Sequence, residues 1–226
     1  SPDGTIRLAS AVDSAGRMTY SVTDGGVRLF EPSRLGFEAA EADLGGGFAV
    51  EHVSRTSVDE TWTQPWGENK ENRSRYNEMA VRLRNGGGVR LTLRFRLFDD
   101  GLGFRYEYEA SGADSLRVTD ELTEFRFAAG DSSTIPASFD TYELLYRKLP
   151  LSELADANTP ATFKVGGLYG SIHEAALYDF PEMTLRKTYG LAFKSDLAPL
   201  PDGTKAHDGN KFTTAWRTVQ LAPDAV

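Results

Sequence analysis

The sequence has 226 residues, of which 40% are hydrophobic, and its formal net charge is −8 because 33 acidic residues outnumber 25 basic ones. A chain of this length can bury roughly 70% of its unfolded surface, so one large domain needs no covalent cross-links. The basic residues are scattered, which argues against a nucleic-acid partner, and the absence of cysteine excludes disulfides and thiolate metal sites. No apolar run reaches the length of about 18 residues that a membrane span needs, so we expect none.

The prevailing hydrophobic period is two, which is typical of β-strands with one buried face. Residues 1–4 form a polar turn rather than a signal peptide. From there the alternation predicts strands, in chain order, over Thr5–Val12, Met18–Thr23, Val27–Phe30, Phe48–Ser57, Asn77–Leu83, 89–97, 102–109, Ser115–Val118, Glu124–Phe127, Thr162–Val165, 167–172, Leu191–Lys194 and Phe212–Leu221.

The clearest alternation lies in residues 89–97 and 102–109, which are separated by the turn-forming residues 99–101. These segments predict a β-hairpin. Its outer face should pair basic with acidic side chains across the strands, namely Arg90, Arg94 and Arg96 with Glu107 and Glu109.

Many strands joined by glycine-rich turns, with hardly any segment of helical period, predict an all-β fold. We expect an antiparallel β-sandwich that forms one domain over residues 1–221. The only segment with helical character is Leu151–Ala155, for which we expect one turn after Pro150. No repeat of about 20–50 residues is visible, which excludes propellers and solenoids.

Two tryptophans, Trp62 and Trp66, lie in the polar segment Asp59–Arg75, which is longer than a hairpin turn requires. Indoles flanked by carboxylates suit stacking on a sugar while the acids bind its hydroxyl groups. The alternative is that both indoles fill a small apolar cluster beneath this connection.

The motifs of common enzyme classes are absent. The three histidines, His52, His173 and His207, are too dispersed for a zinc site, and the sequence contains no nucleophile elbow or phosphate-binding loop. One pair stands out, because Glu174 follows His173 where an apolar strand ends. A carboxylate in that position suits a metal ligand or a contact between domains.

Several separate motifs occur in an order that resembles the N-terminal domain of glycoside hydrolase family 97, whose members are α-glucosidases and α-galactosidases. The motifs are Ser1–Gly4, Ser57–Trp62, Pro65–Glu68, Arg75–Glu78, Phe98–Tyr106, Glu121–Phe125, Ser171–Leu177 and Trp216–Thr218. The resemblance covers nearly the whole chain. One departure is Ala215, where the family often has proline.

The resemblance implies a β-supersandwich similar to galactose mutarotase, followed in the family by a (β/α)₈ barrel that carries the catalytic residues. Residues 222–226 would then begin the linker to that barrel. The resemblance also implies that Glu174 is one ligand of an active-site calcium ion. It further implies that the domain packs on the barrel and walls the oligosaccharide pocket, with candidate residues Trp62, Trp66, Glu68, Asn77 and His173. A periplasmic or cell-surface location is implied in the same way.

Two functions from different classes follow. The first is the non-catalytic domain of a calcium-dependent, exo-acting α-glycosidase. The second is a stand-alone sugar-binding module or a mutarotase-like epimerase, which would need its own acid–base pair. Adjacent strand residues point to opposite faces, so His173 and Glu174 would not cooperate in one cleft.

Three expectations accompany the first function. Trp62 or Trp66 should be partly exposed. Glu174 should lie near the surface, without a salt bridge that competes with the metal. The isolated domain should bind calcium weakly or not at all, because calcium takes about 6–8 oxygen ligands.

Overall fold

The computed structural model describes residues 1–110 and 115–224, and it contains 21 β-strands and no helix within those ranges. The strands are β1 Ile6–Val12, β2 Met18–Asp24, β3 Val27–Leu35, β4 Phe37–Ala39, β5 Asp43–Leu44, β6 Phe48–Thr63, β7 Glu71–Asn85, β8 Val89–Phe98, β9 Gly101–Ala110, β10 Leu116–Glu121, β11 Glu124–Arg126, β12 Asp131–Thr134, β13 Arg147–Pro150, β14 Asp156–Asn158, β15 Ala161–Val165, β16 Leu168–Ala175, β17 Met183–Tyr189, β18 Ala192–Leu197, β19 Ala206–Asp208, β20 Lys211–Thr213 and β21 Trp216–Ala222.

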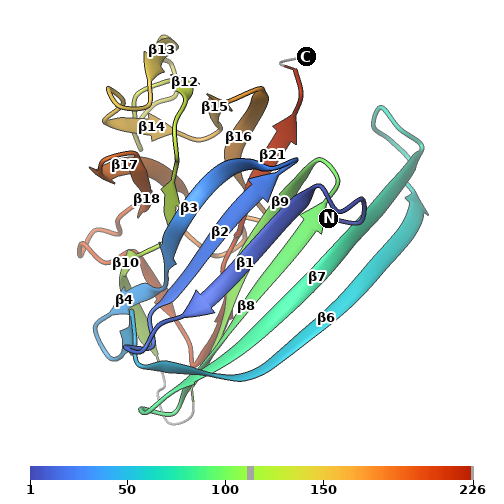
Figure 1. The fold of residues 1–226 in the computed structure, drawn as a ribbon. Coiled ribbons are helices and arrows are strands. Elements are labelled where there is room, and N and C mark those ends of the chain that lie inside the picture. The colour runs from blue at the N-terminus through green and yellow to red at the C-terminus, as the bar shows by residue number, and fades with distance from the viewer. Residues whose placement is uncertain (111–114, 225–226) are drawn as a thin grey trace.

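One large sheet dominates the molecule. It has ten strands, with the order β13-β12-β15-β16-β21-β9-β8-β7-β6 and β20 paired beside β9. Three smaller sheets have the orders β1-β2-β3, β19-β10-β4-β5 and β11-β18-β17-β14. Every strand pairing among the described residues is antiparallel. In Figure 1 the sheet β1–β3 lies across β8 and β9, so the fold is the expected antiparallel β-sandwich.

The three smaller sheets are linked to one another and together form the second layer of the sandwich. A bridge between Phe30 and Phe127 joins β3 to the chain after β11. The backbone N–H of Ser195 donates to the carbonyl of Thr123, which connects β18 to the segment between β10 and β11.

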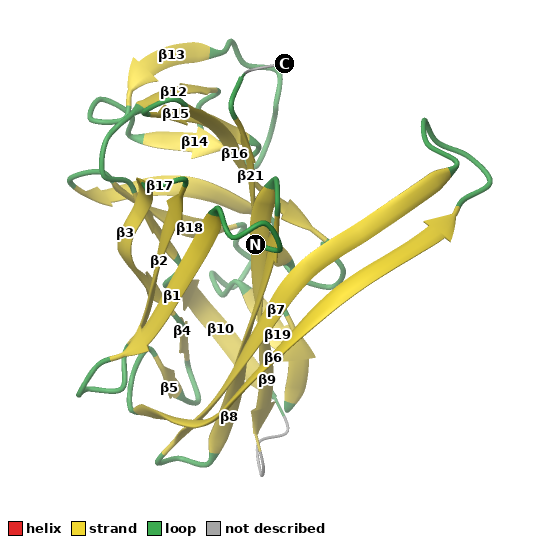
Figure 2. Cartoon of the chain, turned by 45° about the vertical axis from the view of Figure 1, so that its right-hand side comes forward, coloured by secondary structure: helices red, strands yellow, loops and turns green. Residues whose placement is uncertain are grey.

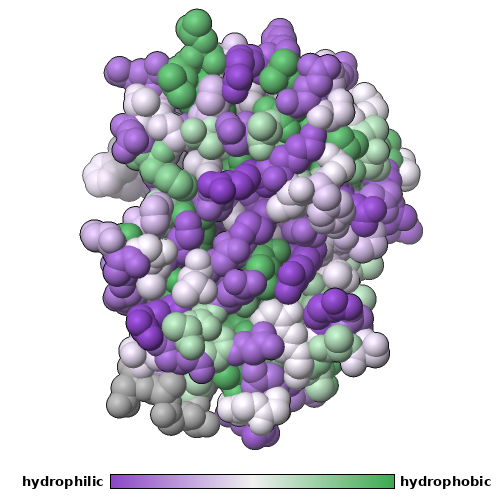
Figure 3. All heavy atoms as spheres, turned by 90° about the vertical axis from the view of Figure 1, so that its left-hand side faces the viewer, coloured by the Kyte–Doolittle hydropathy of each residue, from purple (hydrophilic) through white to green (hydrophobic). Residues whose placement is uncertain are grey.

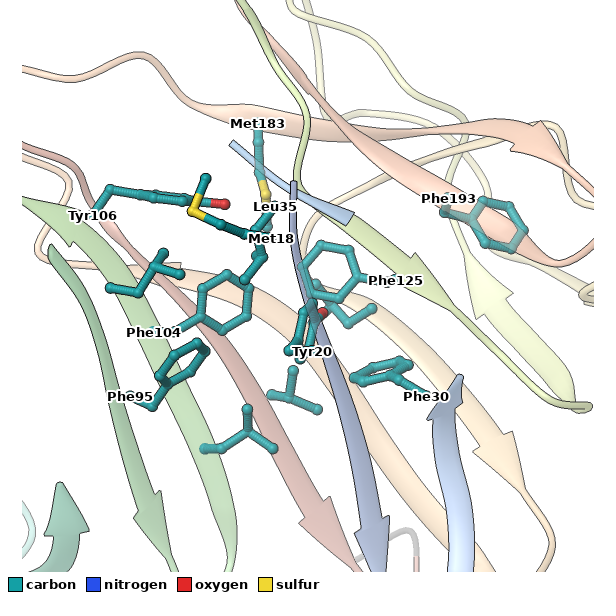
Figure 4. Close-up of a cluster of buried hydrophobic side chains, with 14 of the residues drawn as sticks. Met18, Tyr20, Phe30, Leu35, Phe95, Phe104, Tyr106, Phe125, Met183 and Phe193 are labelled. Atoms are coloured by element: carbon teal, nitrogen blue, oxygen red, sulfur yellow. The ribbon is translucent and has the colours of Figure 1, made fainter. Parts of the chain in front are cut away.

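Aromatic side chains from both layers meet in the core (Figure 4). Phe104 of β9, in the large sheet, contacts Tyr20 of β2 with ring centroids 5.0 Å apart and Phe125 of β11 with centroids 6.3 Å apart. These side chains are fully buried, so burial of apolar surface holds the layers together.

The predicted hairpin of residues 89–109 is confirmed as β8 and β9, with Arg90 opposite Glu109 and Thr92 opposite Glu107. On its outer face the Arg94 Nε atom donates to Glu107 at 2.7 Å, and Arg96 pairs with Glu78 of β7 at 2.8 Å. The guanidinium carbons of Arg96 and Arg105 each lie over the ring of Trp216, 4.7 Å from its centroid.

Other strand predictions needed correction. The structure places a turn, not a helix, at Leu151–Ala155. His207 lies in the short strand β19, which was not predicted, and the predicted strand Phe212–Leu221 is divided into β20 and β21. The expected linker, residues 222–226, begins at the last residue of β21, and residues 225–226 lie outside the described residues.

The surface is mixed in character. Figure 3 views the side that carries β17 and β18, where hydrophobic side chains are interspersed with hydrophilic ones. Within residues 1–110 and 115–224, no helix is long and apolar enough to cross a membrane.

Candidate functional site

The sequence-predicted metal ligand, Glu174, lies near the end of β16 directly opposite Arg217 of β21. The Nη1 group of Arg217 donates to Oε1 of Glu174. The other edge of the guanidinium binds Glu121, the last residue of β10, through Nε to Oε1 at 3.1 Å and Nη2 to Oε2 at 2.5 Å. One arginine therefore holds two carboxylates. We call Glu121, Arg217 and Glu174 the carboxylate–arginine cluster.

The cluster is shielded from solvent. The side chains of Arg217 and Glu121 are 0% exposed and that of Glu174 is 5% exposed. The connection between β16 and β17 folds tightly, with Ala176 and Asp179 both at φ 51°. It brings Phe180 over the guanidinium carbon of Arg217 at 5.7 Å from the ring centroid.

A backbone group completes the contacts of Glu174. The N–H of Met183, at the start of β17, donates to Oε2 at 3.0 Å. Each oxygen of Glu174 therefore accepts one hydrogen bond from the domain itself. A carboxylate has about four lone-pair directions, so two remain for other partners.

Burial and charge oppose each other in this cluster. Burial raises the pKa of Glu174, and the Arg217 guanidinium partly offsets that shift. Burial disfavours the charged form of Arg217, but the carboxylates of Glu121 and Glu174 outweigh it and raise the arginine's pKa. With all three groups ionised, the cluster carries a formal charge of −1, which favours a nearby cation.

The expectation that Glu174 is free of a salt bridge is wrong, and its side chain is only 5% exposed. The register of β16 against β21 places it opposite Arg217, whose core-facing position demands a carboxylate partner. The pair is therefore a consequence of burying an arginine.

Calcium, the metal implied by the family resemblance, fits this site only in part. Glu174 offers oxygen, as calcium prefers, and the cluster has an excess negative charge. Across the part of the chain that the structure describes, however, no group of three or more His, Cys, Asp or Glu side chains could hold a metal. A calcium ion bound to Glu174 would therefore need ligands beyond those that the described residues offer at this site.

The side chain of His173 lies on the opposite face of β16 from that of Glu174, as strand geometry predicts. It lies opposite Thr218 of β21. Its Nδ1 atom is buried without a hydrogen-bond partner, and burial lowers the pKa of the imidazole. The two residues do not form an acid–base pair in one cleft.

The polar segment Asp59–Arg75 is not the unstructured connection that we expected. β6 continues into this segment as far as Thr63, and β7 begins within it at Glu71. Together the two strands form an arm that projects from the body of the molecule (Figure 2). The arm was missed because most of its residues are exposed on both faces, which removes the alternation that marks a strand.

The sequence-predicted aromatic residues lie near the tip of this arm. Trp62 is 47% exposed and Trp66 is 81% exposed, so the expectation of exposure is confirmed and the indoles do not fill an apolar cluster. Glu68 is also exposed in the tip, while Asn77 accepts a hydrogen bond from Ser57 at 2.7 Å at the base of the arm. The tip lies away from β16 in Figure 2, so the structure does not bring these residues to Glu174.

A second exposed apolar region was not identified from the sequence. It comprises the residues 139–146, which precede β13, and the connection after β16. Its exposed members are Phe139, Tyr142, Leu144, Leu145, Tyr146, Leu177 and Tyr178. The hydroxyl of Tyr142 donates to Glu182 at 2.5 Å, which joins the two segments near Glu174.

Substituting Trp66 by alanine in the 226-residue chain should change the free energy of unfolding by no more than about 0.5 kcal/mol, since the indole is mostly solvated. Urea unfolding of the Trp66→Ala variant measures this value. The matched control is Trp216→Ala, which removes a partly buried indole contacted by two arginines and should cost more. A loss above about 1 kcal/mol for Trp66→Ala would mean that the indole has a packing role.

Two residues of the cluster, Arg217 and Glu121, were not assigned roles from the sequence. A usable signal existed, because Arg217 alternates with Val219 and Leu221 on the core-facing side of its strand. An arginine there predicts at least one buried carboxylate, although not which one.

Comparison with known proteins gives concordant results. The family model described as "Glycosyl-hydrolase 97 N-terminal" matches residues 1–226. A curated protein named "Probable retaining alpha-galactosidase", from Streptomyces bingchenggensis (strain BCW-1), is 28% identical over 166 residues, which is 73% of this chain and 26% of that protein.

Among solved structures, a glycoside hydrolase family 97 enzyme in complex with acarbose, from Pseudoalteromonas sp. strain K8, superposes with a TM-score of 0.95 and 34% identity over 100% of this chain. The match covers 35% of that enzyme's chain. A beta-arabinopyranosidase superposes with a TM-score of 0.88 at 22% identity over 99% of this chain and 39% of its own, a likeness of fold alone. The chain thus spans about a third of these relatives.

Proposed function

This chain belongs to the glycoside hydrolase family 97 N-terminal domains, and from that premise we propose that it is the non-catalytic part of a longer calcium-dependent, exo-acting α-glycosidase. The longer enzyme would cleave terminal α-glucosides or α-galactosides with carboxylates carried by a following barrel. The domain would pack on that barrel, contribute Glu174 to the calcium site and wall part of the oligosaccharide pocket.

The observation that carries the calcium role is the state of Glu174. Its carboxylate is held by two donors, belongs to a cluster of net charge −1 and retains lone pairs, yet no further ligands accompany it among the described residues. Such a group suits a site completed by another domain. Bound calcium would orient sugar hydroxyl groups and stabilise negative charge.

The packing and pocket-wall roles are supported by exposed aromatic side chains. The apolar region formed by residues 139–146 and Leu177–Tyr178 adjoins the connection that covers the cluster, and the arm presents Trp62 and Trp66. Exposed apolar patches of this kind commonly mark interfaces, and aromatic rings also stack on sugars.

The non-catalytic role is supported by the buried carboxylates. Glycoside hydrolysis needs two carboxyl groups about 5–9.5 Å apart that flank a reachable bond. Glu121 and Glu174 are both committed to Arg217 and shielded from solvent. Neither is free to act on a substrate within this domain.

The purified 226-residue chain is therefore expected not to hydrolyse aryl α-glucosides or α-galactosides, whereas the full-length enzyme should. Release of the aryl alcohol, followed by absorbance, measures both proteins side by side. Turnover by the isolated chain that disappears when one of its own carboxylates is replaced would refute the non-catalytic assignment.

A further inference from the structure

We propose that Arg217 and Glu121 are positioning residues for the calcium ligand: Glu121 fixes the plane of the Arg217 guanidinium, and Arg217 fixes the orientation of the Glu174 carboxylate. This inference rests on the proposed function of Glu174. It assigns a specific task to two buried residues that do not themselves bind the metal.

The shape of the guanidinium fixes the directions of its donors. A guanidinium is planar and presents its N–H donors in a rigid fork. Two of these donors, on Nε and Nη2, bind the two oxygens of Glu121, which fixes the plane of the group. The Nη1 group must then point in one direction, and that direction contains Oε1 of Glu174.

The Glu174 carboxylate has little remaining freedom to rotate. Met183 N–H binds Oε2 at 3.0 Å, so the two oxygens are held by donors from different strands, β17 and β21. Phe180 packs over the guanidinium of Arg217, whose side chain is 0% exposed. The carboxylate therefore keeps one orientation before any metal arrives, which lowers the entropic cost of binding.

Charge acts in the same direction. With both carboxylates ionised beside one arginine, the cluster has a net charge of −1, which favours an incoming cation. Without the Glu121 carboxylate, Arg217 and Glu174 would form a neutral pair, and the excess negative charge of the cluster would be lost. The Arg217 guanidinium would then compete with calcium for Glu174 and would repel the calcium ion electrostatically.

The decisive variant is Glu121→Gln in the full-length enzyme, because it keeps the size of the side chain and does not alter Glu174. Mutation of residues that orient metal ligands typically weakens metal affinity by about 10–100-fold. We therefore expect the Glu121→Gln variant to bind calcium at least about tenfold more weakly, as measured by calorimetry. Terbium luminescence lifetimes should also report additional water on the ion. The matched control is Glu41→Gln, which breaks an exposed Glu–Arg pair at Arg117 and should leave calcium affinity unchanged.

A second variant, Arg217→Lys, keeps the charge but removes the fork, and it should also weaken calcium in protein that remains folded by circular dichroism. The inference is overturned if both variants lower only the unfolding temperature and leave calcium affinity and the terbium lifetime unchanged.

Glu174→Gln is measured in parallel. If that variant binds calcium normally, the proposed ligand fails and this inference fails with it; if it binds weakly while Glu121→Gln and Arg217→Lys bind normally, only the inference fails.

Discussion

Replacing Glu174 by glutamine in the full-length enzyme is expected to weaken calcium binding by about tenfold or more, which is about 1.4 kcal/mol or more, and to lower activity. Glutamine keeps the shape of the side chain and one oxygen acceptor, but it removes the negative charge that a hard cation needs. Calorimetric titration with calcium, together with the rate on an aryl α-glycoside, measures both effects.

The fold should survive this change, because the glutamine oxygen can still accept from Arg217. Circular dichroism of the metal-free variant provides the control. Unchanged calcium affinity in a correctly folded Glu174→Gln variant would eliminate the ligand role and leave the residue as a partner of Arg217 alone.

Replacing Phe104 by alanine in the 226-residue chain should cost about 3–5 kcal/mol of unfolding free energy. The side chain is fully buried and contacts rings from both layers, Tyr20 and Phe125 among them. Its removal would leave a cavity where the two layers meet. Urea unfolding followed by tryptophan fluorescence measures the loss.

The matched control for this prediction is Phe139→Ala, which removes a half-exposed ring from an irregular segment and should cost far less. Equal effects of the two substitutions would contradict the view that Phe104 links the layers of one common core.

The sequence predicted the fold where strands have one buried face. The hairpin of β8 and β9 was predicted with its turn and outer charges, because alternation and turn chemistry are both local signals. The arm formed by β6 and β7 lacks an inward face over most of its length, so its strands gave no such signal beyond Ser57. Short strands such as β12, β13 and β14 were missed for a different reason, since three or four residues carry too little pattern.

The candidate site could be located but not described from the sequence. The His-Glu pair marked the end of β16, yet the partners of Glu174 are distant along the chain. Arg217 is 43 residues from Glu174, and Glu121 is 96 residues from Arg217. Only the packing of β10, β16 and β21 around one core brings them together, which is why the salt bridge was not foreseen.

The most direct test of the central claim, that this domain completes a calcium site in a longer enzyme, is a crystal structure of the full-length enzyme grown with calcium. We predict an ion with a Glu174 oxygen at about 2.3–2.6 Å, Arg217 still bound to the same carboxylate, and the remaining ligands from outside this domain. A fully coordinated active-site calcium whose ligands all come from the rest of the enzyme, with Glu174 bound only to Arg217 and Met183, would contradict the claim.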